Sequence, residues 1–174
     1  MPVRQPQPVS DPAFWKERLE QAKRGQHLHY SVYLAGPTLW DNIYKIHLQI
    51  IEKEIPKGSK VLDIGCGYGR MAPLFDKYTG IDISPDFIAL AQEIHPDKKF
   101  LVADLNKLPF KDKEFEVGFM VSVRGMIIGN LGEEAWEPME KECKRVCKKV
   151  LVLEYGVYES HRDTHDTIAE YEVL

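Results

Sequence analysis

The spacing of apolar positions along the chain changes near residue 60. Before that point it is helical: Trp15, Leu19 and Ala22 recur three or four residues apart behind an Asp-Pro pair suited to a helix start. This spacing predicts a first helix that ends before Gly25. A second helix is predicted from about Thr38 to about Glu54.

From residue 60 onward, short apolar runs alternate with helical segments. The runs predicted as strands are Val61–Ile64, Tyr78–Ile83, Lys99–Ala103, Glu116–Val123 and Val150–Tyr155, and helices are predicted from Pro85 to about Ile94 and over Glu133–Val146. This alternation indicates βαβ units and a mainly parallel sheet. Ligands of such sheets bind beyond the carboxyl ends of the strands, so the residues after each strand are the candidates for chemistry.

Composition narrows the class of protein. The 174 residues are 44% hydrophobic and 29% charged, which is typical of one globular domain. The net charge of −4 argues against a general nucleic-acid binder, and no apolar run is long enough to predict a membrane span. Three cysteines are too few for a disulfide framework, and the N-terminus lacks the apolar segment of a signal peptide. We therefore expect a cytoplasmic protein.

A glycine-rich loop follows the first predicted strand. Gly65, Gly67 and Gly69 allow positive φ and let a ligand approach the backbone closely. Arg70 stands where the dinucleotide-binding fingerprint needs a third glycine, and Asp63 would repel a pyrophosphate. The loop therefore favours a ligand without phosphates that carries a positive group.

Two more carboxylates follow the next two strands. Asp82 comes 17 residues after Gly65 (82 − 65), where an acidic residue can accept hydrogen bonds from ribose hydroxyls. Its alternative role is to cap the following helix, which Ser84 can already do. Asp104 is placed to accept from an adenine amino group, and its alternative role is that of a turn or cap residue.

Three segments together resemble a known family. Val61–Gly69 resembles motif I of class I S-adenosylmethionine-dependent methyltransferases; Gly80–Ser84 and Ala103–Leu105 are similar to the family's second-strand and adenine-side motifs. The likeness spans about residues 58–155 and points to the small-molecule branch. It implies an α/β fold with a three-layer, Rossmann-like, mainly parallel sheet beneath an N-terminal helical lid.

The resemblance also implies a cofactor site. S-adenosylmethionine would bind there and S-adenosylhomocysteine would be the product, with Asp63 near the methionine amino group, Asp82 at the ribose and Asp104 at the adenine. The full set of implied cofactor-binding residues is Asp63, Gly65, Cys66, Gly67, Asp82, Ile83, Asp104, Leu105 and Ser122. Because the cofactor is cationic, three carboxylates suit it on charge as well.

The acceptor side is less strongly specified. The segment after the fourth strand, residues 121–130, is predicted as a loop and lacks the Pro-Pro signature of nucleic-acid amino-methylating enzymes. We therefore expect methyl transfer to an N or O atom of a small molecule. The candidate catalytic residues are His29 and Tyr33, in an aromatic segment that is either a lid or a packed connector, and Glu154 after the fifth strand.

Length gives the last expectations. Residues 1–57 form the arm and lid and residues 58–174 the cofactor-binding core, with only 19 residues (174 − 155) after the fifth strand. This predicts a sheet that lacks part of the usual C-terminal hairpin, its edge covered by the N-terminal helices or by a second subunit in a homodimer. The alternative function is a non-catalytic cofactor-binding regulatory or partner subunit. His161, Asp163 and His165 could share one face, but we take that tail as a polar linker and predict no metal site.

Overall fold

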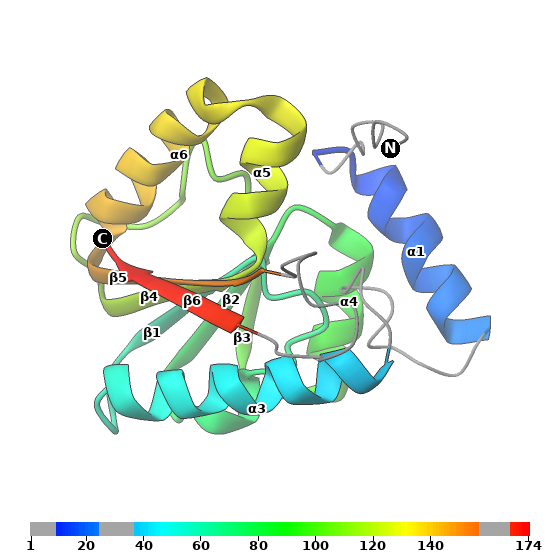
Figure 1. The fold of residues 1–174 in the computed structure, drawn as a ribbon, viewed down its shortest axis with the longest axis horizontal. Coiled ribbons are helices and arrows are strands. Elements are labelled where there is room, and N and C mark those ends of the chain that lie inside the picture. Colours follow the sequence, from blue (N-terminus) through cyan, green and yellow to red (C-terminus); the bar gives the residue numbers. More distant parts are fainter. Residues whose placement is uncertain (1–9, 25–36, 157–167) are drawn as a thin grey trace.

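A computed structural model of the chain describes residues 10–24, 37–156 and 168–174 (Figure 1). Its helices are α1 (Pro12–Arg24), α3 (Pro37–Glu54), α4 (Pro85–Ile94), α5 (Val123–Leu131) and α6 (Glu133–Val146), with a short 3₁₀ turn, η1 (Ala72–Leu74). Its strands are β1 (Val61–Ile64), β2 (Tyr78–Asp82), β3 (Lys99–Val102), β4 (Phe115–Val121), β5 (Cys147–Gly156) and β6 (Ile168–Val173).

The strands form a six-stranded sheet of order β3-β2-β1-β4-β5-β6. The first five pair in parallel and β6 is antiparallel to β5. The strand order reverses direction between β1 and β4, and a ligand site is expected at the carboxyl ends of the strands at such a point. The predicted α/β class with a Rossmann-like, mainly parallel sheet is confirmed.

Helices cover both faces of the sheet (Figure 1). On one face α3 and α4 bury Ile51 and Ile88 against the strands, and on the other α5 and α6 bury Ile127 and Trp136. The alternating side chains of β1 serve both layers, which is why all four of its residues are buried. Helix α1 lies outside these layers and packs on α4.

Local sequence explains the start of α4. The Ser84 hydroxyl accepts a hydrogen bond from the Phe87 amide at 3.3 Å, and Pro85 occupies the first turn, where its missing N–H has no cost. In α6, acids open the helix and bases close it, as the helix dipole favours.

The predicted loop over residues 121–130 was wrong. Strand β4 ends at Val121, and α5 runs from Val123 to Leu131. Ser122, the N-cap residue just before the helix, has φ 59°, and its side chain makes no capping hydrogen bond. The first turn of α5 is held instead by Glu154 of β5, which lies 29 residues further along the chain. No local sequence pattern could therefore predict where this helix begins.

The C-terminal part of the sheet consists of β5 and β6 in the residues that the structure describes. Within the described residues, β6 is the one strand that follows β5. The Tyr171 hydroxyl on β6 donates to Glu54 of α3 at 3.2 Å and accepts from Lys53 at 2.9 Å. This N-terminal helix therefore packs near β6, while a cover over the strand's outer edge stays a prediction.

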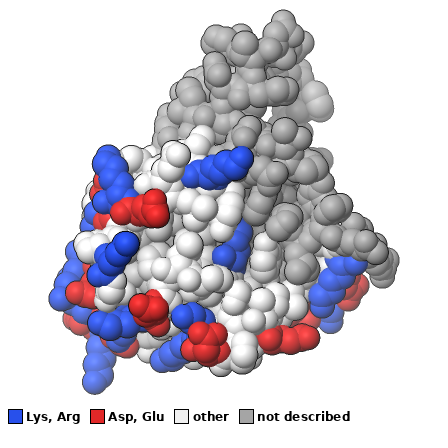
Figure 2. All heavy atoms as spheres, turned by 90° about the horizontal axis from the view of Figure 1, so that it is seen from below, with Lys and Arg blue, Asp and Glu red and all other residues white. Residues whose placement is uncertain are grey.

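The described surface mixes charges of both signs. On the face in Figure 2, acidic and basic side chains lie beside one another rather than in separate fields. No described helix is both long and apolar enough to cross a membrane.

Candidate functional site

A cleft lies at the carboxyl ends of β1 to β4, where the strand order reverses. It encloses about 1,100 Å³ of space, its open mouth included. Residues from four successive strand ends line it: Asp63, Gly65, Cys66 and Gly67; Ile81, Asp82 and Ile83; Ala103, Asp104 and Leu105; and Val121 and Val123. Every residue predicted to face the cofactor lies there except Ser122, whose two neighbours do.

The loop after β1 brings its backbone to the cleft. Gly65 and Gly67 have φ of 71° and 55°, a region that side chains disfavour. A Cβ on Gly65 would lie 2.5 Å from Cγ2 of Val123 on α5. The Gly65 and Cys66 amides donate to the Ile81 carbonyl at 2.8 and 2.9 Å, which fixes the loop against β2.

Asp82 joins this loop to the start of α4. Its Oδ2 accepts from the Gly67 amide and its Oδ1 from the Ser84 amide, each at 2.9 Å. Burial raises the pKa of Asp82, and these amides oppose that rise. Each carboxylate oxygen has a second lone pair, so Asp82 can still accept from two neighbouring hydroxyls.

Asp63 is the buried carboxylate of the cleft. Burial raises its pKa to about 7, against the opposing effects of the Tyr78 hydroxyl and the Arg70 guanidinium. The hydroxyl donates to Oδ2 of Asp63 at 2.7 Å. The site therefore holds an acid whose charge changes near neutral pH and which a bound cation would keep ionised.

Asp104 is exposed and shapes the turn after β3. Its Oδ1 accepts from both the amide and the side-chain nitrogen of Asn106 at 2.9 Å. The turn role is thus present, and the carboxylate also lines the cleft.

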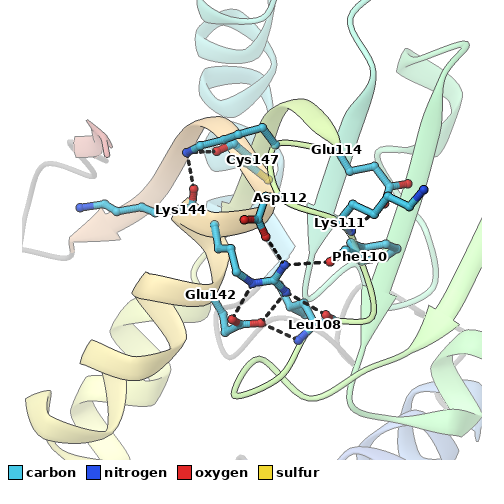
Figure 3. Close-up of polar contacts among 10 residues, drawn as sticks. Leu108, Phe110, Lys111, Asp112, Glu114, Glu142, Lys144 and Cys147 are labelled. Atoms are coloured by element: carbon cyan, nitrogen blue, oxygen red, sulfur yellow. Dashed lines mark hydrogen bonds and ion pairs between the residues drawn. The ribbon is translucent and has the colours of Figure 1, made fainter.

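The connection that follows Asp104 is held by α6 (Figure 3). Arg145 donates to the carbonyls of Phe110 and Leu108 at 2.8 and 3.0 Å and to Asp112 at 2.9 Å. Glu142 accepts from the Leu108 amide at 2.9 Å. No local pattern predicts these contacts, because their partners lie 33 to 37 residues apart in the sequence.

The apolar wall of the cleft was also missed as a site feature. It comes from four helices: Trp15 of α1, Phe87 of α4, Met126, Ile127 and Leu131 of α5, and Met139 of α6. Trp15 and Phe87 pack with ring centroids 6.2 Å apart. The helical spacing around Trp15 predicted the helix but not that this side chain lines the cleft.

Of the three candidate catalytic residues, the structure describes only Glu154. His29 and Tyr33 lie outside the described residues. Glu154 is partly buried, which raises its pKa, and its carboxylate accepts from the Gly125 amide at 3.0 Å. It therefore binds the first turn of α5, and it is not among the residues that line the cleft. Its catalytic role stays a prediction.

Ser122 is a partly buried residue between two residues that line the cleft. It adopts a left-handed backbone that is uncommon outside glycine, and its Oγ has no hydrogen-bond partner within the described residues. Strain of this kind clusters at functional sites.

The three cysteines are free, buried thiols. Cys143 lies on α6, whereas Cys147 is the first residue of β5. The described part of the chain groups no three side chains that could hold a metal ion. His161, Asp163 and His165 lie outside it.

Comparison with known proteins gives the family. Residues 62–151, just over half of the chain, match the family model described as a methyltransferase domain. A 2-methyl-6-phytyl-1,4-hydroquinone methyltransferase of Synechocystis is 39% identical over 112 residues, which are 56% of this chain and 35% of that protein. The chain spans less than half the length of the curated relatives it matches.

Two solved structures agree with this match. The PH0226 protein of Pyrococcus horikoshii has a TM-score of 0.58 and 27% identity, over 69% of this chain and 59% of that one. A SAM-dependent methyltransferase of Methanosarcina mazei has a TM-score of 0.54 and 27% identity, over 62% and 57%. The sheet order and the cleft at its reversal define a Rossmann-like α/β class of protein. Within it, this chain belongs to the class I S-adenosylmethionine-dependent methyltransferases.

The residues present fit that cofactor. The backbone at Gly65 leaves a space that a Cβ would fill. Beside it lie Asp82, which can accept hydrogen bonds from ribose hydroxyls, and Asp63, which can pair with an ammonium group. No dinucleotide phosphate needs to be accommodated, and Arg70 replaces the glycine that such a fingerprint requires.

Proposed function

We propose that the protein transfers a methyl group from S-adenosylmethionine to an N or O atom of a small-molecule acceptor. The observation that carries this proposal is the cleft at the strand reversal, where the Asp63, Asp82 and Asp104 carboxylates lie around a glycine backbone. We also propose that it acts in the cytoplasm.

Each carboxylate has a distinct binding task in this proposal. Asp82, fixed by the Gly67 and Ser84 amides, accepts from the two ribose hydroxyls. Asp104 with the Leu105 amide binds the adenine edge, and Asp63 pairs with the methionine ammonium. When bound, the cofactor supplies a methyl group activated by a sulfonium.

The chain's further contribution is positioning and exclusion of water. Trp15, Met126 and Ile127 form an apolar wall, which suits an acceptor with an apolar body. The name of the Synechocystis relative, a hydroquinone methyltransferase, fits an acceptor of that kind. An N or O nucleophile loses a proton on methylation, and His29, Tyr33 and Glu154 are the proposed acceptors of it.

One observation favours the alternative of a cofactor-binding subunit that transfers nothing itself. The titratable side chains lining the described cleft are Asp63, Cys66, Arg70, Asp82 and Asp104. Burial raises the pKa of Cys66 well above its usual range, and no histidine or glutamate is among these lining residues. A base would then have to come from elsewhere.

Formation of S-adenosylhomocysteine separates the two functions. The isolated chain is incubated with S-adenosylmethionine and panels of phenolic, hydroquinone and amine acceptors, with Asp82→Asn as the matched control. Acceptor-dependent product formation by the wild type that the variant lacks supports methyl transfer. Binding of S-adenosylhomocysteine without turnover on any acceptor favours the subunit. Sedimentation of the same samples tests the homodimer.

A further inference from the structure

The Tyr78 side chain lies in a slot that Gly80 leaves open. A Cβ on Gly80 would be 2.9 Å from the Tyr78 hydroxyl, 2.9 Å from Sγ of Cys66 and 2.8 Å from Cδ1 of Phe100. The Phe100 ring meets the Tyr78 ring edge-on at 5.6 Å, and the Phe75 ring stacks at 6.5 Å. The phenol is therefore buried and fixed in direction.

The Tyr78 hydroxyl points toward the Asp63 carboxylate. The Tyr78 hydroxyl donates to Oδ2 of Asp63 at 2.7 Å, and both side chains are buried. Burial, together with the nearby Asp63 carboxylate, raises the pKa of Tyr78 well above its usual range, so the hydroxyl keeps its proton and acts as the donor. This contact engages Oδ2 and leaves Oδ1 outside it, on a residue that lines the cleft.

We propose that Tyr78 is a positioning residue for the cofactor: its hydroxyl holds the Asp63 carboxylate in the orientation that receives the methionine ammonium. The inference rests on the proposed function and deepens it, since it gives a role to a residue that does not itself line the cleft. A carboxylate already held by a buried donor loses less rotational freedom when the cation binds, so the affinity is higher.

The charged surroundings of Asp63 agree with this role. Besides Tyr78, the groups that act on its ionisation are Arg70, which favours the charged form, and Asp82, which opposes it. The Cys66 thiol stays protonated because burial raises its pKa. The Tyr78 hydroxyl and the Arg70 guanidinium are thus the two groups that favour the ionised form of the buried Asp63, and removing the hydroxyl leaves only Arg70.

The test compares two ligands that differ in the amino-acid part. S-adenosylhomocysteine carries the ammonium, and 5′-methylthioadenosine lacks it. For Tyr78→Phe we expect about a ten-fold loss of affinity for S-adenosylhomocysteine, the size expected for a hydrogen bond to a charged group, and no change for methylthioadenosine. Tyr171→Phe is the matched control, because its hydroxyl contacts Lys53 and Glu54 instead, and it should leave both affinities unchanged.

Three outcomes overturn the proposal. These are an unchanged affinity of Tyr78→Phe for S-adenosylhomocysteine, an equal loss for both ligands, and a ten-fold effect of Tyr78→Phe that persists in an Asp63→Asn background. If the wild type binds neither ligand, the proposed function itself fails. Should Tyr78→Phe not fold, Tyr78→Met fills the slot with a flexible apolar side chain and must give the same split between ligands.

Discussion

The guanidinium of Arg145 meets the carboxylate of Glu142 at two points, Nε to Oε1 at 2.8 Å and Nη2 to Oε2 at 2.9 Å. The same carboxylate accepts from the Leu108 amide, so the pair joins α6 to the connection that carries the adenine-side residues (Figure 3). A two-point pair with further backbone partners is more specific than an ordinary surface ion pair.

Arg145→Ala should therefore lower the melting temperature by about 2–4 °C and weaken S-adenosylhomocysteine binding, because two backbone carbonyls lose their donor. Lys144→Ala is the control on the same helix: it removes only a half-exposed pair with Glu140 and should change neither quantity. Equal melting temperatures for the two variants would contradict the role given to Arg145.

The same pair predicts a pH dependence. The hydrogen bonds from Arg145 lower the pKa of Glu142 from 4.5 to about 2. A lowered pKa stabilises the folded state above the usual value and loses that effect as the pH falls from 4.5 toward 2. Denaturant unfolding across this range should show wild type losing more stability than Glu142→Gln. Parallel curves would refute the assignment.

Gly80 and Gly129 make a matched pair of glycine substitutions. Gly80→Ala forces a Cβ against three side chains, including the Tyr78 hydroxyl, and should cost about 1–3 kcal/mol of unfolding free energy. Gly129, on α5, has open space around it, so Gly129→Ala should be neutral or stabilise by up to about 1 kcal/mol. Chemical denaturation measures both, and a neutral Gly80→Ala would show that the slot is not tight.

The raised pKa of Asp63 predicts that cofactor binding releases protons. Its raised pKa of about 7 means that the stability gained by the protonated form is fully present below 3.8 and lost as the pH rises through 7. Binding of an ammonium group favours the ionised form, so S-adenosylhomocysteine should release about half a proton at pH 7. Titration in two buffers of different ionisation enthalpy measures this release. Asp63→Asn should show none, and an equal release from that variant would contradict the pairing.

Much of the scaffold followed from local pattern. Strand β1 was predicted correctly because a short, mostly apolar run directly before a glycine-rich loop is typical of a buried strand, and the Ser84 cap indicated the start of α4. The three carboxylates of the cleft could be predicted because parallel strands bring their carboxyl ends to one edge.

What escaped prediction depends on distant partners. The start of α5 is bound by Glu154, 29 residues further along, and Trp15 reaches the cleft only because α1 packs on α4. The contact between Tyr78 and Asp63 needs the pairing of β1 with β2 and the missing side chain of Gly80. None of these relations leaves a periodic signal in one sequence.

The central claim is that the cleft binds S-adenosylmethionine through Asp82. Calorimetric titration with S-adenosylhomocysteine tests it most directly, with Asp82→Ala as the variant and Asp97→Ala, an exposed aspartate next to Lys98, as the control. We predict binding by the wild type and the control and at least a ten-fold weaker affinity, to order of magnitude, for Asp82→Ala. No binding by the wild type, or equal binding by Asp82→Ala, would contradict the account.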